Sequence, residues 1–204
     1  MNLVLDITNY IGIVAFSVSG AIKGIRKNMD LLGVLVLGFS TALGGGIIAD
    51  LLLGKTPPTN LTYLPYPTVA LLSSLFTFIF YKIFSHVQKP LLYADAIGLA
   101  AFAAAGSSLA YSVSSDVLLV VAVGVLTSTG GGVIRDVLSN EIPLVLTKDF
   151  YATVAILGSV IYYALRYLGY SDLLATTVSF LLALTIRVLA IKYKWELPRI
   201  RIES

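Results

Sequence analysis

The sequence contains no cysteine and a single histidine, His86, among its 204 residues. A disulfide framework, a thiolate metal site and a cysteine nucleophile are therefore excluded, and one histidine makes zinc hydrolase chemistry implausible. Charged residues are also scarce, at 12% of the chain against about 25% in ordinary soluble domains. We therefore expect no enzymatic activity, no cofactor and no resident metal ion.

Apolar residues take the place of the missing charges. They make up 57% of the chain, and the mean hydropathy is +0.90. A soluble domain of this size cannot hide so much apolar surface from water, which excludes a soluble globular protein, a disordered chain and a free nucleic-acid binder. Because the apolar residues form long blocks, which outer-membrane barrels lack, the sequence predicts a multi-pass, all-α membrane protein surrounded by lipid.

The apolar blocks predict seven transmembrane helices in a single transmembrane domain that covers residues 1–204. They lie at residues 5–24, 31–53, 67–85, 92–111, 116–138, 150–168 and 171–192. Seven spans place the two termini on opposite sides of the membrane. Ten lysine and arginine residues lie on one side, and only Lys55 and Arg166 on the other. The positive-inside rule therefore predicts an outer amino terminus and a basic cytoplasmic tail at residues 193–204.

The chain contains an internal repeat. Residues 11–57 align with residues 97–143 at an offset of 86, without a gap and with 17 identical positions. Repeat one covers about residues 5–85, repeat two about residues 92–168, and the helix at about 171–192 is additional. Three spans are an odd number, so the two units must cross the membrane in opposite directions. Inverted repeats of this kind place their binding or permeation site near the midplane, where the repeats meet.

Each repeat carries three consecutive glycines near the middle of its second span. They are Gly44, Gly45 and Gly46 in the first repeat and Gly130, Gly131 and Gly132 in the second. Each glycine costs a helix interior about 1 kcal/mol relative to alanine. Two explanations stay open: the glycines allow close helix packing, or they form a kink or unwound turn whose carbonyl groups line a pore.

Polar and ionisable residues accompany both triplets. The residues that we expect to belong to an ion pathway are Thr41, Ser128, Thr129, Asp50, Arg135 and Asp136. Two aspartates toward opposite ends of a central constriction favour cations over anions. The alternative is that Arg135 and Asp136 reach the interface or pair with each other for structural reasons. Lys23, Arg26 and Lys27 serve either topology alone or an anionic-lipid or gating surface.

The paired triplets, above all Thr-Gly-Gly-Gly-Val-Ile-Arg-Asp ending at Asp136, resemble the prokaryotic trimeric intracellular cation (TRIC) channels. The resemblance implies a homotrimer in which each subunit holds an hourglass pore for potassium, with sodium. It also implies that the second and fifth spans, kinked at the triplets, line this pore. One departure is that Ala49 stands where the second repeat has Arg135.

A small secondary transporter, for a solute such as an amino acid, remains the alternative function. Inverted repeats with interrupted helices are common in such transporters, and the sequence does not separate a channel from a carrier. A channel would show unitary currents, whereas a carrier would saturate and couple its solute to an ion.

Overall fold

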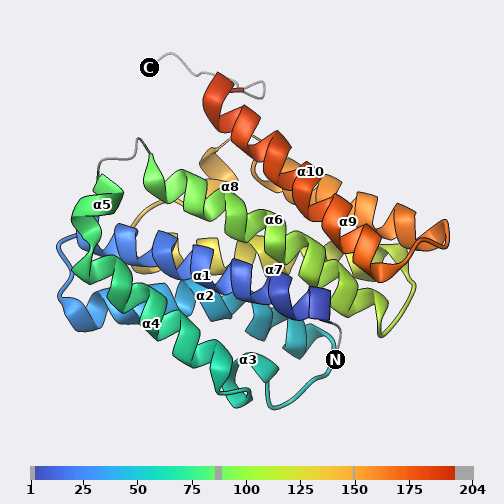
Figure 1. Ribbon diagram of the computed structural model, residues 1–204, viewed down its shortest axis with the longest axis horizontal. Coiled ribbons are helices and arrows are strands. Elements are labelled where there is room, and N and C mark those ends of the chain that lie inside the picture. The colour runs from blue at the N-terminus through green and yellow to red at the C-terminus, as the bar shows by residue number, and fades with distance from the viewer. Residues whose placement is uncertain (1–2, 86–88, 149, 196–204) are drawn as a thin grey trace, which may run out of the picture.

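The computed structural model describes residues 3–85, 89–148 and 150–195, which form helices and their connections (Figure 1). His86 and the tail beyond Trp195 lie outside the described residues. The helices are α1 (Leu3–Arg26), α2 (Leu31–Leu52), α3 (Thr59–Thr62), α4 (Pro65–Ile79), α5 (Tyr81–Ser85), α6 (Pro90–Tyr111), α7 (Val117–Leu138), α8 (Leu144–Thr147), α9 (Ala152–Tyr167) and α10 (Asp172–Tyr193).

Within the part of the chain that the structure describes, five helices are long and apolar enough to cross a membrane: α1, α2, α6, α7 and α10. The predicted third span is divided, because α4 ends at Ile79 and α5 begins at Tyr81. With 15 and 16 residues, α4 and α9 reach roughly 22–24 Å at 1.5 Å per residue, less than the ~30 Å of a hydrocarbon core. The count of seven spans therefore stays a prediction.

The helices contact one another in a pattern that repeats. In the first half, α1 packs against α2 and α4; in the second, α6 packs against α7 and α9. The halves meet through two contacts between equivalent helices, α1 with α6 and α2 with α7. Figure 1 shows α1 and α6 crossing the front, with α4 below them and α9 and α10 above. The additional helix, α10, lies mainly against α6 and α9.

The ends of α2 and α7 are built alike. The carboxylate of Asp30 accepts a hydrogen bond from the Gly33 N–H (2.7 Å), and Asp116 does the same for Leu119 (2.8 Å). These side chains satisfy N–H groups that the first helical turn leaves free. After each helix the chain reverses through a residue with positive φ, Gly54 at 70° and Asn140 at 55°. These are two residue types that adopt this conformation readily.

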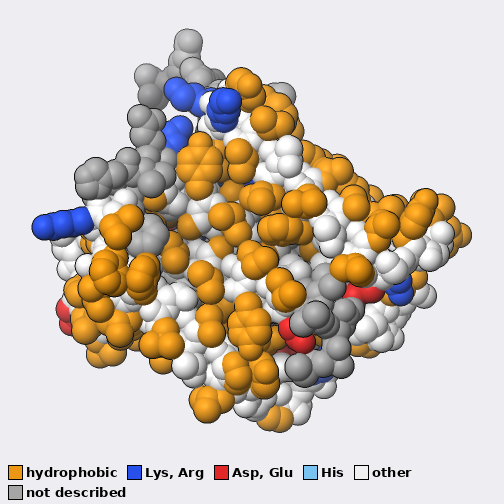
Figure 2. All heavy atoms as spheres, viewed as in Figure 1, with side chains coloured by type: hydrophobic (Ala, Val, Ile, Leu, Met, Phe, Trp, Pro, Cys, Tyr) orange, Lys and Arg blue, Asp and Glu red, His pale blue; other side chains and the backbone are white. Residues whose placement is uncertain are grey.

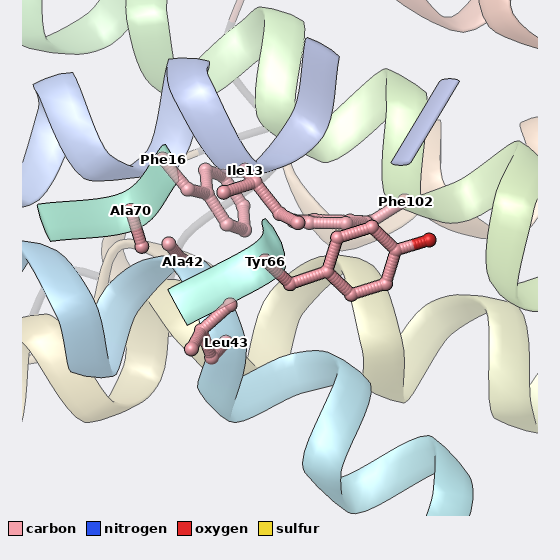
Figure 3. Packing of buried hydrophobic residues seen from close by; sticks show 7 residues of the cluster. All are labelled: Ile13, Phe16, Ala42, Leu43, Tyr66, Ala70 and Phe102. Atoms are coloured by element: carbon pink, nitrogen blue, oxygen red, sulfur yellow. The ribbon is translucent and has the colours of Figure 1, made fainter. Parts of the chain in front are cut away.

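A cluster of buried side chains joins the halves at α1 and α6. It comprises Ile13, Phe16, Ala42, Leu43, Tyr66, Ala70 and Phe102 (Figure 3). The rings of Phe16 and Phe102 lie 5.3 Å apart between centroids. Each ring also covers a glycine of the other repeat: a Cβ on Gly98 would overlap Phe16, and one on Gly12 would lie 2.8 Å from Phe102. These glycines therefore provide the space for the two rings.

The surface of the single chain is largely apolar (Figure 2). Large hydrophobic side chains are exposed along α2, α7 and α10, among them Leu32, Leu118 and Leu181. Exposed apolar surface on this scale requires lipid or another apolar partner rather than water. Most of the lysine and arginine side chains visible in Figure 2 lie toward the upper left, around the end of α10 in Figure 1, and others lie at the left edge and on the right.

Candidate functional site

The middle glycine of each triplet lies where α2 crosses α7. A Cβ added to Gly45 would overlap the carbonyl oxygen of Thr127, and one added to Gly131 would overlap the carbonyl oxygen of Thr41. Both helices continue as α-helix through the triplets, so the unwound turn considered from the sequence is wrong. The contacts support the packing explanation, since backbone meets backbone at this crossing. A bend at the triplets stays a prediction.

The remaining glycines of the triplets face different surroundings. Gly44 faces the end of the Ile134 side chain and Gly130 that of Ile48, so these two positions are closed by the opposite helix. Gly46 faces Asn60, and Gly132 faces the Tyr151 hydroxyl. The third glycines therefore point to polar groups on either side of the crossing.

The hydroxyl groups before the triplets bond within their own helices. Thr41 donates to the Leu37 carbonyl (2.6 Å), and Thr127 donates to that of Val123 (2.5 Å). Ser128 and Thr129 both donate to the Val125 carbonyl, at 3.0 and 2.8 Å. All four side chains are buried. Their oxygens still have acceptor capacity, but their protons are already used.

On one side of the crossing lies a cavity of about 240 Å³, named here the Asp50 cavity. Its walls come from α1, α2, α3, α4, α6 and α7 and their connections, and they include Asp6, Asn9, Asp50, Lys55, Tyr66 and Thr127. Asp50 is 2% exposed. Its Oδ2 accepts a hydrogen bond from the Thr59 N–H (2.7 Å), and the Asn9 amide donates to the Tyr66 hydroxyl (3.4 Å).

At the opposite end of α1 lies a cavity of about 420 Å³, the Lys23 cavity. It is lined by Lys23, Arg26, Lys27, Lys89, Leu91, Leu92, Glu141 and Leu144. Lys23 pairs with Glu141, and its Nζ lies 3.7 Å from Asp136; the Lys27 Nζ lies 2.9 Å from Glu141. Hydrogen bonds from the two lysines lower the pKa of Glu141 to about 2. The carboxylate of Glu141 is therefore ionised at neutral pH.

A buried ion-pair network lies around Arg135, whose side chain is fully buried. Its Nε donates to Asp136 Oδ1 (2.9 Å) and its Nη2 to Oδ2 (3.1 Å), which makes the pair bidentate. Its Nη1 donates to Ser19 Oγ (2.7 Å) and to Asp95. Arg135 and Asp136 therefore pair with each other inside the protein, which was one of the two structural alternatives named from the sequence. Their side chains do not extend to the membrane interface.

Sequence reasoning missed Asp95 as a partner of this network. Asp95 is the only charged residue in the apolar block at residues 92–111, and its ion partner Arg135 is 40 residues away along the chain. Within the described residues, its Oδ2 and the buried Tyr151 hydroxyl have no hydrogen-bond partner. The Arg187 guanidinium lies over the Tyr151 ring, 4.8 Å from its centroid. The signal in the sequence was an ionisable residue inside a span, which is costly unless it is paired or functional.

The two aspartates that follow the triplets also share a role in positioning the backbone. As Asp50 binds the N–H of Thr59, Asp136 Oδ2 binds the N–H of Leu144 (2.8 Å). Each carboxylate therefore holds the first residue of the short helix that follows, α3 or α8. The equivalent short helices start at an offset of 85 rather than 86, so the gapless alignment fails by one residue in this loop.

Comparisons with known proteins agree with this architecture. A family model described as glycine transporter matches residues 6–82 and 92–167, the two repeats in turn. The UPF0126 membrane protein YvgT of Bacillus subtilis is 40% identical over 194 residues, which are 95% of each chain.

Solved structures of TRIC channels are similar over nearly the whole chain. One TRIC cation channel is 66% identical, with a TM-score of 0.90 and 98% of each chain covered. The trimeric intracellular cation channel orthologue from Rhodobacter sphaeroides is 34% identical, with a TM-score of 0.87, covering 94% of this chain and 99% of that one. The resemblance inferred from the glycine triplets is thus confirmed, and the chain is a multi-pass membrane protein that belongs to the prokaryotic TRIC channel family.

Proposed function

We propose that the protein is a monovalent cation channel that conducts potassium, with sodium, through a pathway inside each chain. The pathway runs from the Asp50 cavity, past the crossing of α2 and α7, to the Lys23 cavity. One observation carries the proposal: the Asp50 cavity reaches Gly46 of the first triplet, and Lys23, which lines the second cavity, lies 3.7 Å from Asp136, just after the second triplet. This arrangement gives the pathway the shape of an hourglass whose narrowest point is the crossing of α2 and α7. Any bend of these two helices lies at that narrowest point.

Buried carboxylates supply the preference for cations. Asp50 lines one cavity, and Asp95 and Asp136 lie near the other end of the pathway, all of them buried. Arg135 pairs with Asp95 and Asp136, and the Lys23 Nζ lies 3.7 Å from Asp136, so the negative charge that favours cations lies mainly at Asp50, away from the basic Lys23 cavity. A pathway lined by carboxylates attracts cations and repels anions. The chemistry of the relatives supports the same assignment, since the similar solved structures are of cation channels.

Arg135 closes the pathway in this conformation. Its guanidinium is fully buried between Asp136, Asp95 and Ser19, in the stretch that separates the crossing from the Lys23 cavity. Conduction then requires this side chain to exchange partners, because a desolvated ion cannot pass through an occupied ion-pair network.

The assembly and orientation follow the family and the charge pattern. A homotrimer is proposed because the Rhodobacter sphaeroides relative is described as trimeric. The basic end, with Lys23, Arg26 and Lys27, is placed in the cytoplasm by the positive-inside rule, and there the exposed Arg26 and Lys27 meet anionic lipid headgroups, while Lys23 is buried. The amino terminus then lies outside, and α4 and α9 complete the seven spans.

Single-channel recording of the purified protein in planar bilayers, with unequal potassium chloride concentrations, tests the proposal. Discrete openings that reverse near the potassium potential are the expected result. Silent bilayers, together with saturable solute uptake driven by an ion gradient in vesicles, would contradict it and would assign the same glycines to a transporter.

A further inference from the structure

The repeat makes the Asp50 cavity the counterpart of the Arg135 site. The equivalent pairs at the offset of 86 are Ala49 and Arg135, Asp50 and Asp136, Asn9 and Asp95, and Ala105 and Ser19. In the second repeat, a guanidinium group fills the space between the two carboxylates and the serine hydroxyl. In the first repeat, the short side chain of Ala49 leaves the corresponding space open as part of a cavity of about 240 Å³.

The polar groups that would receive a guanidinium are still present in the first repeat. The Asp50 carboxylate is oriented as Asp136 is, because each Oδ2 accepts the first N–H of a short helix. Its Oδ1, the counterpart of the oxygen that binds Arg135 Nε, accepts no hydrogen bond from any residue that the structure describes. Asn9 uses its amide N–H₂ toward Tyr66, which leaves its carbonyl oxygen as an acceptor.

The charges of the residues that line this cavity also favour a bound cation. Asp6 and Asp50 line it together with Lys55, which gives a formal charge of −1. Within the described chain, no lysine or arginine nitrogen lies within 4 Å of the Asp50 carboxylate. A carboxylate that is 98% buried without a positive partner is costly, and a bound monovalent cation would remove that cost.

We infer that the Asp50 cavity binds a small guanidinium-type cation, such as methylguanidinium, on Asp50 and Asn9. The ligand takes the place that the Arg135 side chain holds in the second repeat. A planar guanidinium suits this site better than a spherical ion, because it donates paired N–H groups to a carboxylate and to a neighbouring acceptor at once. The inference rests on the proposed function only for its effect on current, since binding itself does not require conduction.

Isothermal titration calorimetry of the purified protein in detergent tests the site, with methylguanidinium chloride as the probe. Tetramethylammonium chloride is the control ligand, because it carries the same charge without N–H donors. We expect saturable binding of one methylguanidinium per chain and no saturable binding of tetramethylammonium. The absence of saturable heat with methylguanidinium, or equal binding of both ions, would overturn the inference.

Variants locate the ligand in the cavity. Ala49→Arg supplies a covalently attached guanidinium and should abolish binding, while Asp50→Asn should weaken it at least tenfold. Asp30→Asn removes the same charge from the exposed start of α2 and should bind as the wild type does. If Ala49→Arg does not fold, Asp50→Asn decides, and wild-type affinity in that variant refutes the site.

Bilayer recordings separate this inference from the proposed function. If the protein conducts, methylguanidinium should reduce the potassium current when it is added on the side of the Asp50 cavity. Binding by calorimetry without any current would refute the channel and leave the site standing. Current without saturable methylguanidinium binding would refute the site and leave the channel standing.

Discussion

Gly45 on α2 lies against α7 at the centre of the molecule and faces the carbonyl oxygen of Thr127, four residues before Gly131. Gly131 on α7 lies against α2 in the same way and faces the carbonyl oxygen of Thr41, four residues before Gly45. The arrangement brings α2 and α7 together at backbone distance. It is symmetric because Gly45 and Gly131 are equivalent in the two repeats. The crossing is therefore a junction that both halves form jointly.

Replacing Gly45 with alanine should lower the free energy of unfolding by about 1–3 kcal/mol, because the new methyl group overlaps a backbone oxygen that has little freedom to move. Thermal unfolding in detergent measures the change. Gly130→Ala is the matched control, since its Cβ would meet the flexible end of the Ile48 side chain at 3.0 Å and the Gly45 Cα at an ordinary contact distance of 3.5 Å. Equal losses in the two variants would show that the crossing tolerates a methyl group.

Removing the charge of Asp136 should reduce the preference for cations. Asp136→Asn keeps an oxygen for the Leu144 N–H but weakens the negative potential beside the Lys23 cavity. In a potassium chloride gradient, the reversal potential should move toward zero. Asp30→Asn, which removes an exposed carboxylate at the same end of the bundle, should leave it unchanged. A constant reversal potential in Asp136→Asn would make this aspartate a purely structural residue.

Truncating Arg135 should be strongly destabilising. Arg135→Ala removes the guanidinium that pairs with the buried Asp95 and Asp136 and leaves Asp136 with the more distant Lys23, 3.7 Å away; breaking a buried ion pair in this way costs about 3–5 kcal/mol. The double variant Arg135→Met with Asp95→Asn removes charge from both sides and should recover part of that loss. Thermal unfolding of the three proteins checks the order. A double variant less stable than Arg135→Ala would contradict a charge-compensation role.

The ion pairs of Glu141 should persist through mildly acidic conditions. Lys23 and Lys27 lower its pKa from 4.5 to about 2, so the folded state holds the carboxylate charged more strongly than the unfolded state does. The stabilisation is fully present above about pH 4.5 and is lost as the pH falls toward about 2. The unfolding midpoint of the wild type should therefore fall more steeply than that of Glu141→Gln across this window. Parallel curves would refute the assignment.

Much of the fold could be predicted because the repeat carries residues with local roles. Asp30 and Asp116 cap α2 and α7 as their equivalent positions suggest, and five of the predicted spans are long apolar helices in the structure. The break after Ile79 was missed, because hydrophobic residues continue across it and give no signal in composition.

The candidate site was predicted less completely. Glycine runs predict freedom of the backbone, but the carbonyl groups of Thr41 and Thr127 occupy the adjacent space, so the helices continue without an unwound turn. Arg135 and Asp136 were found because they are charged and adjacent to a triplet. Asp95 was not, since a contact between α6 and α7 depends on how the helices pack and not on spacing along the chain.

The interlocked rings of α1 and α6 have an evolutionary consequence. Phe16 occupies the space above Gly98, and Phe102 that above Gly12, so a larger residue at either glycine requires a smaller one in the opposite half. Among related sequences with the same duplication, a substitution at one of these positions should be accompanied by a substitution at its contact partner in the other repeat. Neither half could then diverge in sequence at this point without a compensating change in the other.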